Sequence, residues 1–257
     1  MAVAWLWLFA RTFSVTFQIG NAIALFLTAW LIYLADRFAD STTLKPGLPR
    51  SVRQKFCLQH RELWISMIAL VAGFDAYVIW RTTALLTFLV GAVVGLIAVA
   101  YLVVNHPLGL IWRSLPAKEI AIGILFAAGT IVAMLPRIPL TGNFVIAVLA
   151  FATLCALNCV SIAGWERDLD RAQRKVSLAT RHPRIAAHAG KICAALALAC
   201  FGLTFYSATT KWFFICVSSS ALLLGWLNRG EGGEDRRTAL ADLLLVTPIV
   251  VLVASAL

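Results

Sequence analysis

Acidic residues recur at the same spacing directly after two long apolar stretches of the chain. Asp36 and Asp40 follow one stretch, and Glu166 and Asp170 follow the other. Residues four apart lie on one face of a helix, so each pair should present two carboxylates side by side. Like charges at this spacing repel, and acids at a helix C-terminus also interact unfavourably with the helix dipole. The repeated pattern therefore predicts a cation held between two acidic walls.

Magnesium is the cation that suits these side chains. Mg²⁺ prefers oxygen ligands and is often shared between one or two carboxylates and the phosphates of a substrate. We therefore interpret the four acids as catalytic, metal-binding residues. The alternative interpretation is that they are ordinary acids at the membrane interface, paired with Arg37, Arg167 and Arg171.

Basic side chains accompany both acidic pairs, as a diphosphate ligand would require. A metal ion offsets only part of the charge of a diphosphate, and nearby bases can neutralise the rest. Of nine basic or histidine side chains on the two loops that follow, we expect two or three to touch such a ligand. The candidates for diphosphate binding are Arg53, Lys55, Arg61, Lys175 and Arg181.

The elements that must position these residues are membrane helices. Hydrophobic residues make up 61% of the 257 positions and charged residues only 13%, whereas a soluble domain of this size needs more polar surface. The apolar runs do not alternate with polar residues, as the strands of a membrane barrel would. The composition therefore predicts an all-α fold, a polytopic membrane helical bundle.

Eight stretches are long enough to be considered as membrane spans, because about 20 apolar residues cross the hydrocarbon core. They are residues 15–40, 63–80, 84–104, 118–135, 143–170, 186–207, 211–228 and 238–257. Residues 1–12 are apolar but too short to span, and we interpret them as a partial or interfacial helix. No linker or low-complexity tract interrupts the chain, so residues 1–257 are expected to form a single transmembrane domain.

The distribution of positive charge predicts the orientation of the bundle. Segments 36–62, 105–119, 164–191 and 228–237 hold 18 of the 22 Lys and Arg residues, and the eight-span scheme places all four on one side. By the positive-inside rule that side is cytoplasmic. We therefore expect an integral protein of the inner or plasma membrane whose active site faces the cytoplasm. The net charge of +10 is explained by topology, without a nucleic-acid partner.

Other polar residues in the apolar stretches are given structural or supporting roles. Asp75 is expected to snorkel or to pair with Arg81, whereas Asp242 is a candidate for orienting a basic residue of the site. The six cysteines form no CxxC pair, so we interpret them as small packing residues rather than disulfides or metal ligands.

At the acidic pairs the chain resembles the UbiA superfamily of intramembrane prenyltransferases. The segment IYLADRFAD (32–40) is similar to the NDxxDxxxD motif of that family, and IAGWERDLD (162–170) is similar to its YAxxDxxxD motif. Segments 116–129 and 241–248 resemble the start of later helices of the family. The sequence departs from the first motif at Ile32 and Tyr33, and from the second at Glu166, which replaces an aspartate.

The resemblance implies a nine-helix fold with a shortened first helix, and a site at the cytoplasmic ends of two helices. It implies that Asp36, Asp40, Glu166 and Asp170 bind Mg²⁺ and a prenyl diphosphate, and it adds Asp168 as a metal ligand. In such a reaction an allylic cation must be shielded from water by an apolar pocket. Tyr33, on the same helix face as the first acidic pair, is expected to offer its ring to that cation.

Three functions fit these features. The first is a Mg²⁺-dependent prenyltransferase that joins an isoprenoid chain from a prenyl diphosphate to a lipophilic acceptor, for example an aromatic one. The second is a membrane terpene cyclase, in which the cation is quenched within its own chain; the altered first motif is compatible with this. The third is a non-enzymatic membrane protein, for example a transporter, whose acids bind ions. A transporter is expected to carry charges at the membrane midplane, whereas these acids cluster at one face. Membrane lipids are expected partners, and the sequence leaves chain length, acceptor and oligomeric state open.

Overall fold

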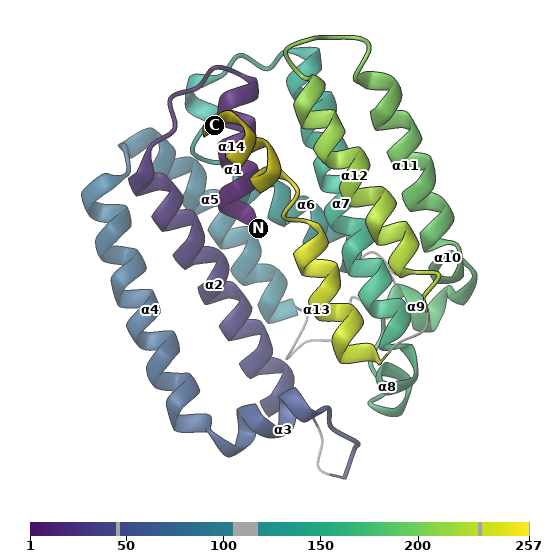
Figure 1. Cartoon of the computed structure of the whole chain (residues 1–257). Coiled ribbons are helices and arrows are strands. Elements are labelled where there is room, and N and C mark those ends of the chain that lie inside the picture. The colour runs from purple at the N-terminus through teal and green to yellow at the C-terminus, as the bar shows by residue number, and fades with distance from the viewer. Residues whose placement is uncertain (45–46, 105–117, 231–232, 257) are drawn as a thin grey trace.

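The protein forms a bundle of helices in the computed structural model, which describes residues 1–44, 47–104, 118–230 and 233–256 (Figure 1). The described residues contain helices and no β-strand, so the predicted all-α class is confirmed. The helices are α1 (Ala2–Thr12), α2 (Ile19–Thr42), α3 (Val52–Gln59), α4 (Arg61–Thr82), α5 (Leu85–Val103), α6 (Lys118–Ile131), α7 (Gly142–Trp165), α8 (Arg167–Ala172), α9 (Leu178–Arg181), α10 (Pro183–Ala187), α11 (Ala189–Leu203), α12 (Lys211–Leu227), α13 (Glu234–Leu244) and α14 (Pro248–Ala256), with a 3₁₀ turn, η3 (Leu135–Arg137).

Four of the described helices are long and apolar enough to cross a membrane, namely α2, α4, α5 and α7. The pair α13 and α14 would make a fifth, because its two halves follow each other with a bend of 43°. Helices α6, α11 and α12 are shorter. Each of the eight predicted stretches therefore contains a helix, but only four of them, or five with the bent pair, are long enough to cross a membrane. Large apolar side chains such as Trp80, Leu89 and Leu198 are exposed on the outer faces, as expected for a surface that meets lipid.

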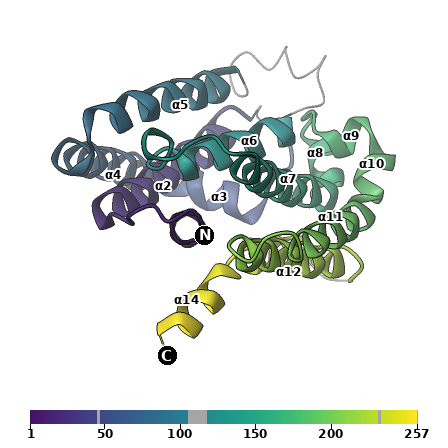
Figure 2. The same cartoon turned by 90° about the horizontal axis from the view of Figure 1, so that it is seen from above.

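Helix α1 lies in the interior of the bundle, and its predicted interfacial position is wrong. Trp5 and Phe9 are completely buried, and their rings lie 4.6 Å from those of Phe151 and Phe213, respectively. Figure 2 shows α1 between α2 and α12. The reason is that α1 is apolar on most of its circumference, and such a helix is most stable when it is surrounded.

The break between α13 and α14 is stabilised by the buried helix. Backbone carbonyls at a helix end lack partners within the helix and need others. The indole nitrogen of Trp5 donates a hydrogen bond of 2.8 Å to the carbonyl of Leu245, and Ser220 donates one of 3.0 Å to the carbonyl of Leu244. The last predicted span is therefore a bent helix pair whose free carbonyls are satisfied by α1 and α12.

Close packing of α6 on α7 depends on a glycine. A Cβ atom placed on Gly123 would lie 2.5 Å from the backbone nitrogen of Ala156, so any side chain at this position would force the helices apart. Small residues allow this kind of approach between membrane helices. The contact fixes Lys118 and Glu119, at the start of α6, next to the end of α7.

The charge-rich segments that the structure describes gather at one end of the bundle. The end of α2, the short helices α3, α8, α9 and α10, and the start of α13 all lie toward the bottom of Figure 1. The expected basic loop at 105–117 lies outside the described residues. The six cysteines are free, and five of them are buried.

Candidate functional site

The first acidic pair lies on the last two turns of α2. The helix continues past its apolar stretch to Thr42, and the hydroxyls of Ser41, Thr42 and Thr43 bond back to backbone carbonyls near its end. Asp36 and Asp40 therefore stay on a regular helix and remain one turn apart. Their carboxylates are placed as the spacing predicts.

The second acidic pair lies where α7 gives way to α8. Helix α7 ends at Trp165, and Glu166 connects it to α8, so the predicted continuous span to residue 170 is divided. The backbone N–H of Asp170 still donates to the carbonyl of Glu166 at 2.8 Å. One helical turn is thus kept across the junction, and Glu166 and Asp170 remain neighbours.

Polar contacts join the segments that carry the two acidic pairs. Nζ of Lys175 lies 3.1 Å from Oδ1 of Asp40, and a guanidinium nitrogen of Arg53 lies 2.7 Å from Oε1 of Glu166. The buried Gln173 side chain donates to Oε1 of Gln54 at 2.8 Å. The loop after α2 and the loop after α7 therefore meet, and two of the five predicted diphosphate-binding bases lie against the acids.

Arg37 and Asp242 lie within electrostatic range of the same cluster. The Arg37 guanidinium interacts electrostatically with Asp36, Asp40 and Glu166. Asp242 accepts a hydrogen bond of 3.3 Å from Asn158 and interacts electrostatically with Arg37 and Arg53. The role of Asp242 in orienting a basic residue of the site stays a prediction.

The ionisation of the Asp170 carboxyl depends on the groups around it. Burial raises the pKa of the Asp170 carboxyl above its ordinary value, while Lys118, a hydrogen bond with Ser177, and Lys175 act in the opposite direction, and Glu166 adds to the rise. Lys175 therefore interacts with both Asp40 and Asp170. Cationic groups at this position are needed to keep the enclosed carboxylate charged.

Several predicted site residues are not brought into the cluster. The Asp168 side chain is 80% exposed and lies near Arg167 and Arg171 on the same short helix. Lys55, Arg61 and Arg181 are exposed on the surface. Asp168 falls outside the cluster because it is two residues from Glu166 and from Asp170, and so it points to another face of the turn.

The donor set suits a magnesium ion that is shared with a phosphate ligand. Among the described residues, no three His, Cys, Asp or Glu side chains are grouped closely enough to hold a metal by themselves. The acids nevertheless offer hard oxygen atoms, and Mg²⁺ commonly uses only one or two carboxylates together with water and substrate phosphates. Asp36, Asp40, Glu166 and Asp170 are the residues that could supply such carboxylates.

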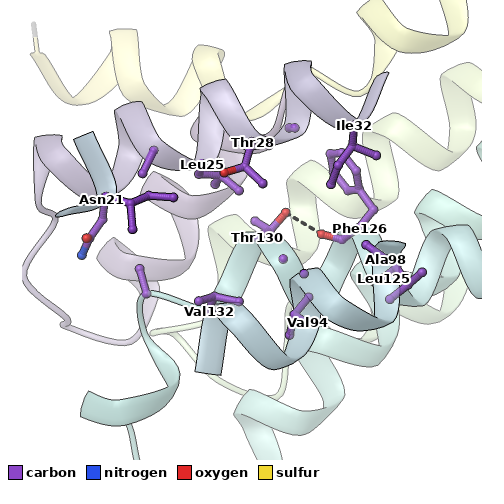
Figure 3. A pocket seen from close by; sticks show the side chains of 18 of the residues that line it. Asn21, Leu25, Thr28, Ile32, Val94, Ala98, Leu125, Phe126, Thr130 and Val132 are labelled. Carbon is purple, nitrogen blue, oxygen red and sulfur yellow. Dashed lines mark hydrogen bonds between the residues drawn. The ribbon is translucent and has the colours of Figure 1, made fainter. Parts of the chain in front are cut away.

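An apolar cavity of about 390 Å³ lies between α1, α2, α4, α5 and α6. Figure 3 shows Asn21, Leu25, Thr28 and Ile32 following one another along the side of α2 that lines it. At one end, Ile32 lies one turn before Asp36. The Tyr101 side chain lines the same cavity and interacts electrostatically with Asp36 and Asp40. The cavity therefore ends about one helical turn from Asp36 and extends from there into the bundle.

Tyr101, rather than Tyr33, is the tyrosine that lines this cavity. The Tyr33 ring is 47% exposed and lies 5.3 Å from the Arg37 guanidinium, in a cation–π contact. Tyr33 is not among the residues that line the cavity, and its expected role beside an allylic cation stays a prediction. The signal for Tyr101 was available in the sequence as a hydroxyl-bearing aromatic residue near the end of an apolar stretch. Lys118, which interacts electrostatically with Asp170, was also not among the predicted site residues.

Scans of protein-family models, curated proteins and solved structures returned no match to this chain. The resemblance to the UbiA superfamily therefore rests on the two acidic motifs.

Proposed function

We propose that the chain is a Mg²⁺-dependent intramembrane prenyltransferase that ionises an isoprenyl diphosphate and transfers the prenyl group to a lipophilic acceptor, aromatic acceptors included. The observation that carries this proposal is that an apolar cavity, lined by Ile32 and Tyr101, ends about one helical turn from Asp36 in the cluster of acids and bases. An amphiphile with a diphosphate head and a hydrocarbon tail fits both parts at once. The cavity volume also lies within the usual range for small-molecule sites.

The head group would bind at the junction of the two acidic pairs. Arg53 and Lys175 already face the acids, and Lys118 interacts electrostatically with Asp170. These bases would turn to the phosphate oxygens and stabilise the negative charge that develops as the C–O bond breaks. A Mg²⁺ ion bound by Asp36, Asp40, Glu166 and Asp170 would add Lewis-acid neutralisation of the leaving diphosphate.

The tail and the allylic carbon would lie in the cavity. Its wall is mostly aliphatic, and water is therefore kept from the cation until the acceptor reacts. The rings of Tyr101 and Phe126 line it and can stabilise a cation through their π-faces. The reason for placing the reaction in a membrane is that both the tail and the acceptor are soluble there.

The proposal includes the arrangement in the membrane. Four of the eight proposed spans are the membrane-length helices α2, α4, α5 and α7. The other four would be α6, α11, α12 and the bent pair α13 and α14. The site end, where the basic segments gather, would face the cytoplasm, since positive residues are retained on that side.

A membrane terpene cyclase is the second candidate. The observation that favours it is that Ile32, an apolar residue, stands in the first motif where the family has a polar one, and its side chain lines the cavity. A cavity without a polar group at this point is suited to a cation that is quenched within its own chain.

The test is to supply the purified protein with prenyl diphosphates of several lengths, with and without lipophilic acceptors, in Mg²⁺ or in EDTA. Pyrophosphate release that requires both Mg²⁺ and an acceptor supports the transferase. A hydrocarbon or alcohol product that forms without an acceptor supports the cyclase. Absence of pyrophosphate release from every diphosphate, or full activity in EDTA, contradicts both.

A further inference from the structure

The apolar cavity contains a buried carboxyl group. Asp75, on α4, is only 4% exposed and lines the cavity. Its Oδ2 accepts a hydrogen bond of 2.7 Å from the hydroxyl of Thr28 on α2. The expected pairing with Arg81 is wrong, since residues six apart point to different faces of a helix.

One oxygen of this carboxyl has no hydrogen-bond partner among the described residues. Oδ1 of Asp75 is buried and unpaired, and so is Oδ1 of Asn21, which lines the same cavity. Buried polar atoms are nearly always satisfied, and acids inside membrane segments usually mark a functional site. Asn21 lies about two helical turns from Thr28 on α2, so the unpaired oxygen of Asp75 is the acceptor that indicates a ligand bringing a hydrogen-bond donor.

This position is distinct from the acidic cluster. Thr28 precedes Asp36 by eight residues on α2, which corresponds to about 12 Å along the helix. The carboxyl of Asp75 therefore lies well inside the bundle, beyond the reach of a group bound directly at Asp36. A ligand that occupies both positions must be elongated, with its middle part in the apolar region between them.

We propose that Asp75 and Thr28 form a binding site for the hydroxyl group of a lipophilic alcohol or phenol. A hydroxyl donates one hydrogen bond and also accepts, so it pairs with a carboxyl in either protonation state. An ammonium group would require two charges to be buried, which costs more free energy than burying a hydroxyl. The identification of this alcohol as a substrate of the enzyme rests on the proposed function, whereas the binding site does not.

The test measures binding without a diphosphate or a metal ion. The full chain in detergent is labelled with a photoreactive fatty alcohol, labelled peptides are identified by mass spectrometry, and 1-dodecanol or 1-chlorododecane competes. For the wild type, the alcohol should compete about 10-fold better than the chloride at peptides of α2 and α4, the scale of one hydrogen bond to a buried acceptor. Asp75→Leu should reduce this ratio to about 1, and Asp75→Asn, which keeps an acceptor oxygen, should retain part of it.

Tyr77→Phe is the matched control, because it removes a hydroxyl from an exposed position on α4, and the ratio should not change. Equal competition by the two compounds in the wild type overturns the proposal. It is also overturned if Asp75→Leu lowers the melting temperature but leaves the ratio unchanged, since the carboxyl then only joins α2 to α4. The binding assay contains no diphosphate, so its result does not depend on whether the protein has the proposed transferase activity.

Discussion

Nζ of Lys175 lies 3.1 Å from Oδ1 of Asp40, and this contact joins the loop after the second acidic pair to the helix that carries the first. Both side chains are partly enclosed, so the pair is screened less than a surface ion pair would be. Lys175 also interacts electrostatically with Asp170. A single cation therefore connects acids from both motifs, which makes Lys175 the base most directly tied to the proposed diphosphate site.

Replacing Lys175 should show whether this side chain contacts the diphosphate directly or only adds to the positive charge of the surface. Lys175→Met is expected to lower kcat/KM for a prenyl diphosphate by about 10–100-fold, because a charge-assisted contact to the leaving group is lost. Arg181→Met is the matched control, since it removes a positive charge from an exposed position of the same loop region. Steady-state pyrophosphate release measures both variants. If the two variants lose activity equally, Lys175 contributes only to the overall electrostatic field of the protein.

Replacing an acid of the cluster should lower turnover much more than replacing Asp168, which lies outside the cluster. Asp36→Ala and Asp170→Ala are each expected to lower turnover by at least about 10²-fold, which corresponds to loss of one strong electrostatic contact of roughly 2.7 kcal/mol. Asp168→Ala should retain activity within about 3-fold, because its side chain is 80% exposed and exposed ion pairs contribute little. Turnover in Mg²⁺ is the measurement, and a large loss in Asp168→Ala would contradict the assignment of the site.

The two tyrosines should respond differently to removal of the ring. Tyr101→Leu is expected to lower turnover by about 5–30-fold, the equivalent of about 1–2 kcal/mol for a desolvated cation–π contact. Tyr101→Phe keeps the ring and should be nearly silent. Tyr33→Leu is the matched control, because this ring lies beside Arg37 and does not line the cavity. Equal damage from Tyr33→Leu and Tyr101→Leu would refute the assignment of Tyr101.

The close contact between α6 and α7 should be sensitive to the size of one residue. Gly123→Val places side-chain atoms against the backbone of Ala156 and is expected to destabilise the protein by about 1–3 kcal/mol. Gly129→Ala, on the same helix, meets no atom within 4 Å and should be neutral or stabilising by about 0.5–1 kcal/mol, because alanine favours helix. Thermal unfolding in detergent measures both, and similar melting temperatures would contradict the packing.

The sequence by itself determined the helical class and the local geometry of the acidic pairs. Long apolar runs without alternation can only satisfy their backbone groups in lipid as helices. A spacing of four places two side chains on one helix face wherever the helix lies, so the relation of Asp36 to Asp40 needed no knowledge of the fold. The basic segments could also be located without the fold, because the positions of Lys and Arg are read directly from the sequence.

Only the tertiary structure decided which side chains from distant segments meet. Lys175 and Arg53 reach the acids, while Arg181 and Lys55 are exposed, and nothing in their residue types distinguishes them. The same is true of Tyr101 and Tyr33, since the direction of each ring depends on its neighbours across the bundle. Helix α1 was misplaced because a short apolar segment suits both an interface and a core. Its position is set by the space that Phe151, Phe213 and the break after α13 leave for it, and such complementarity of shape is not encoded in the local sequence.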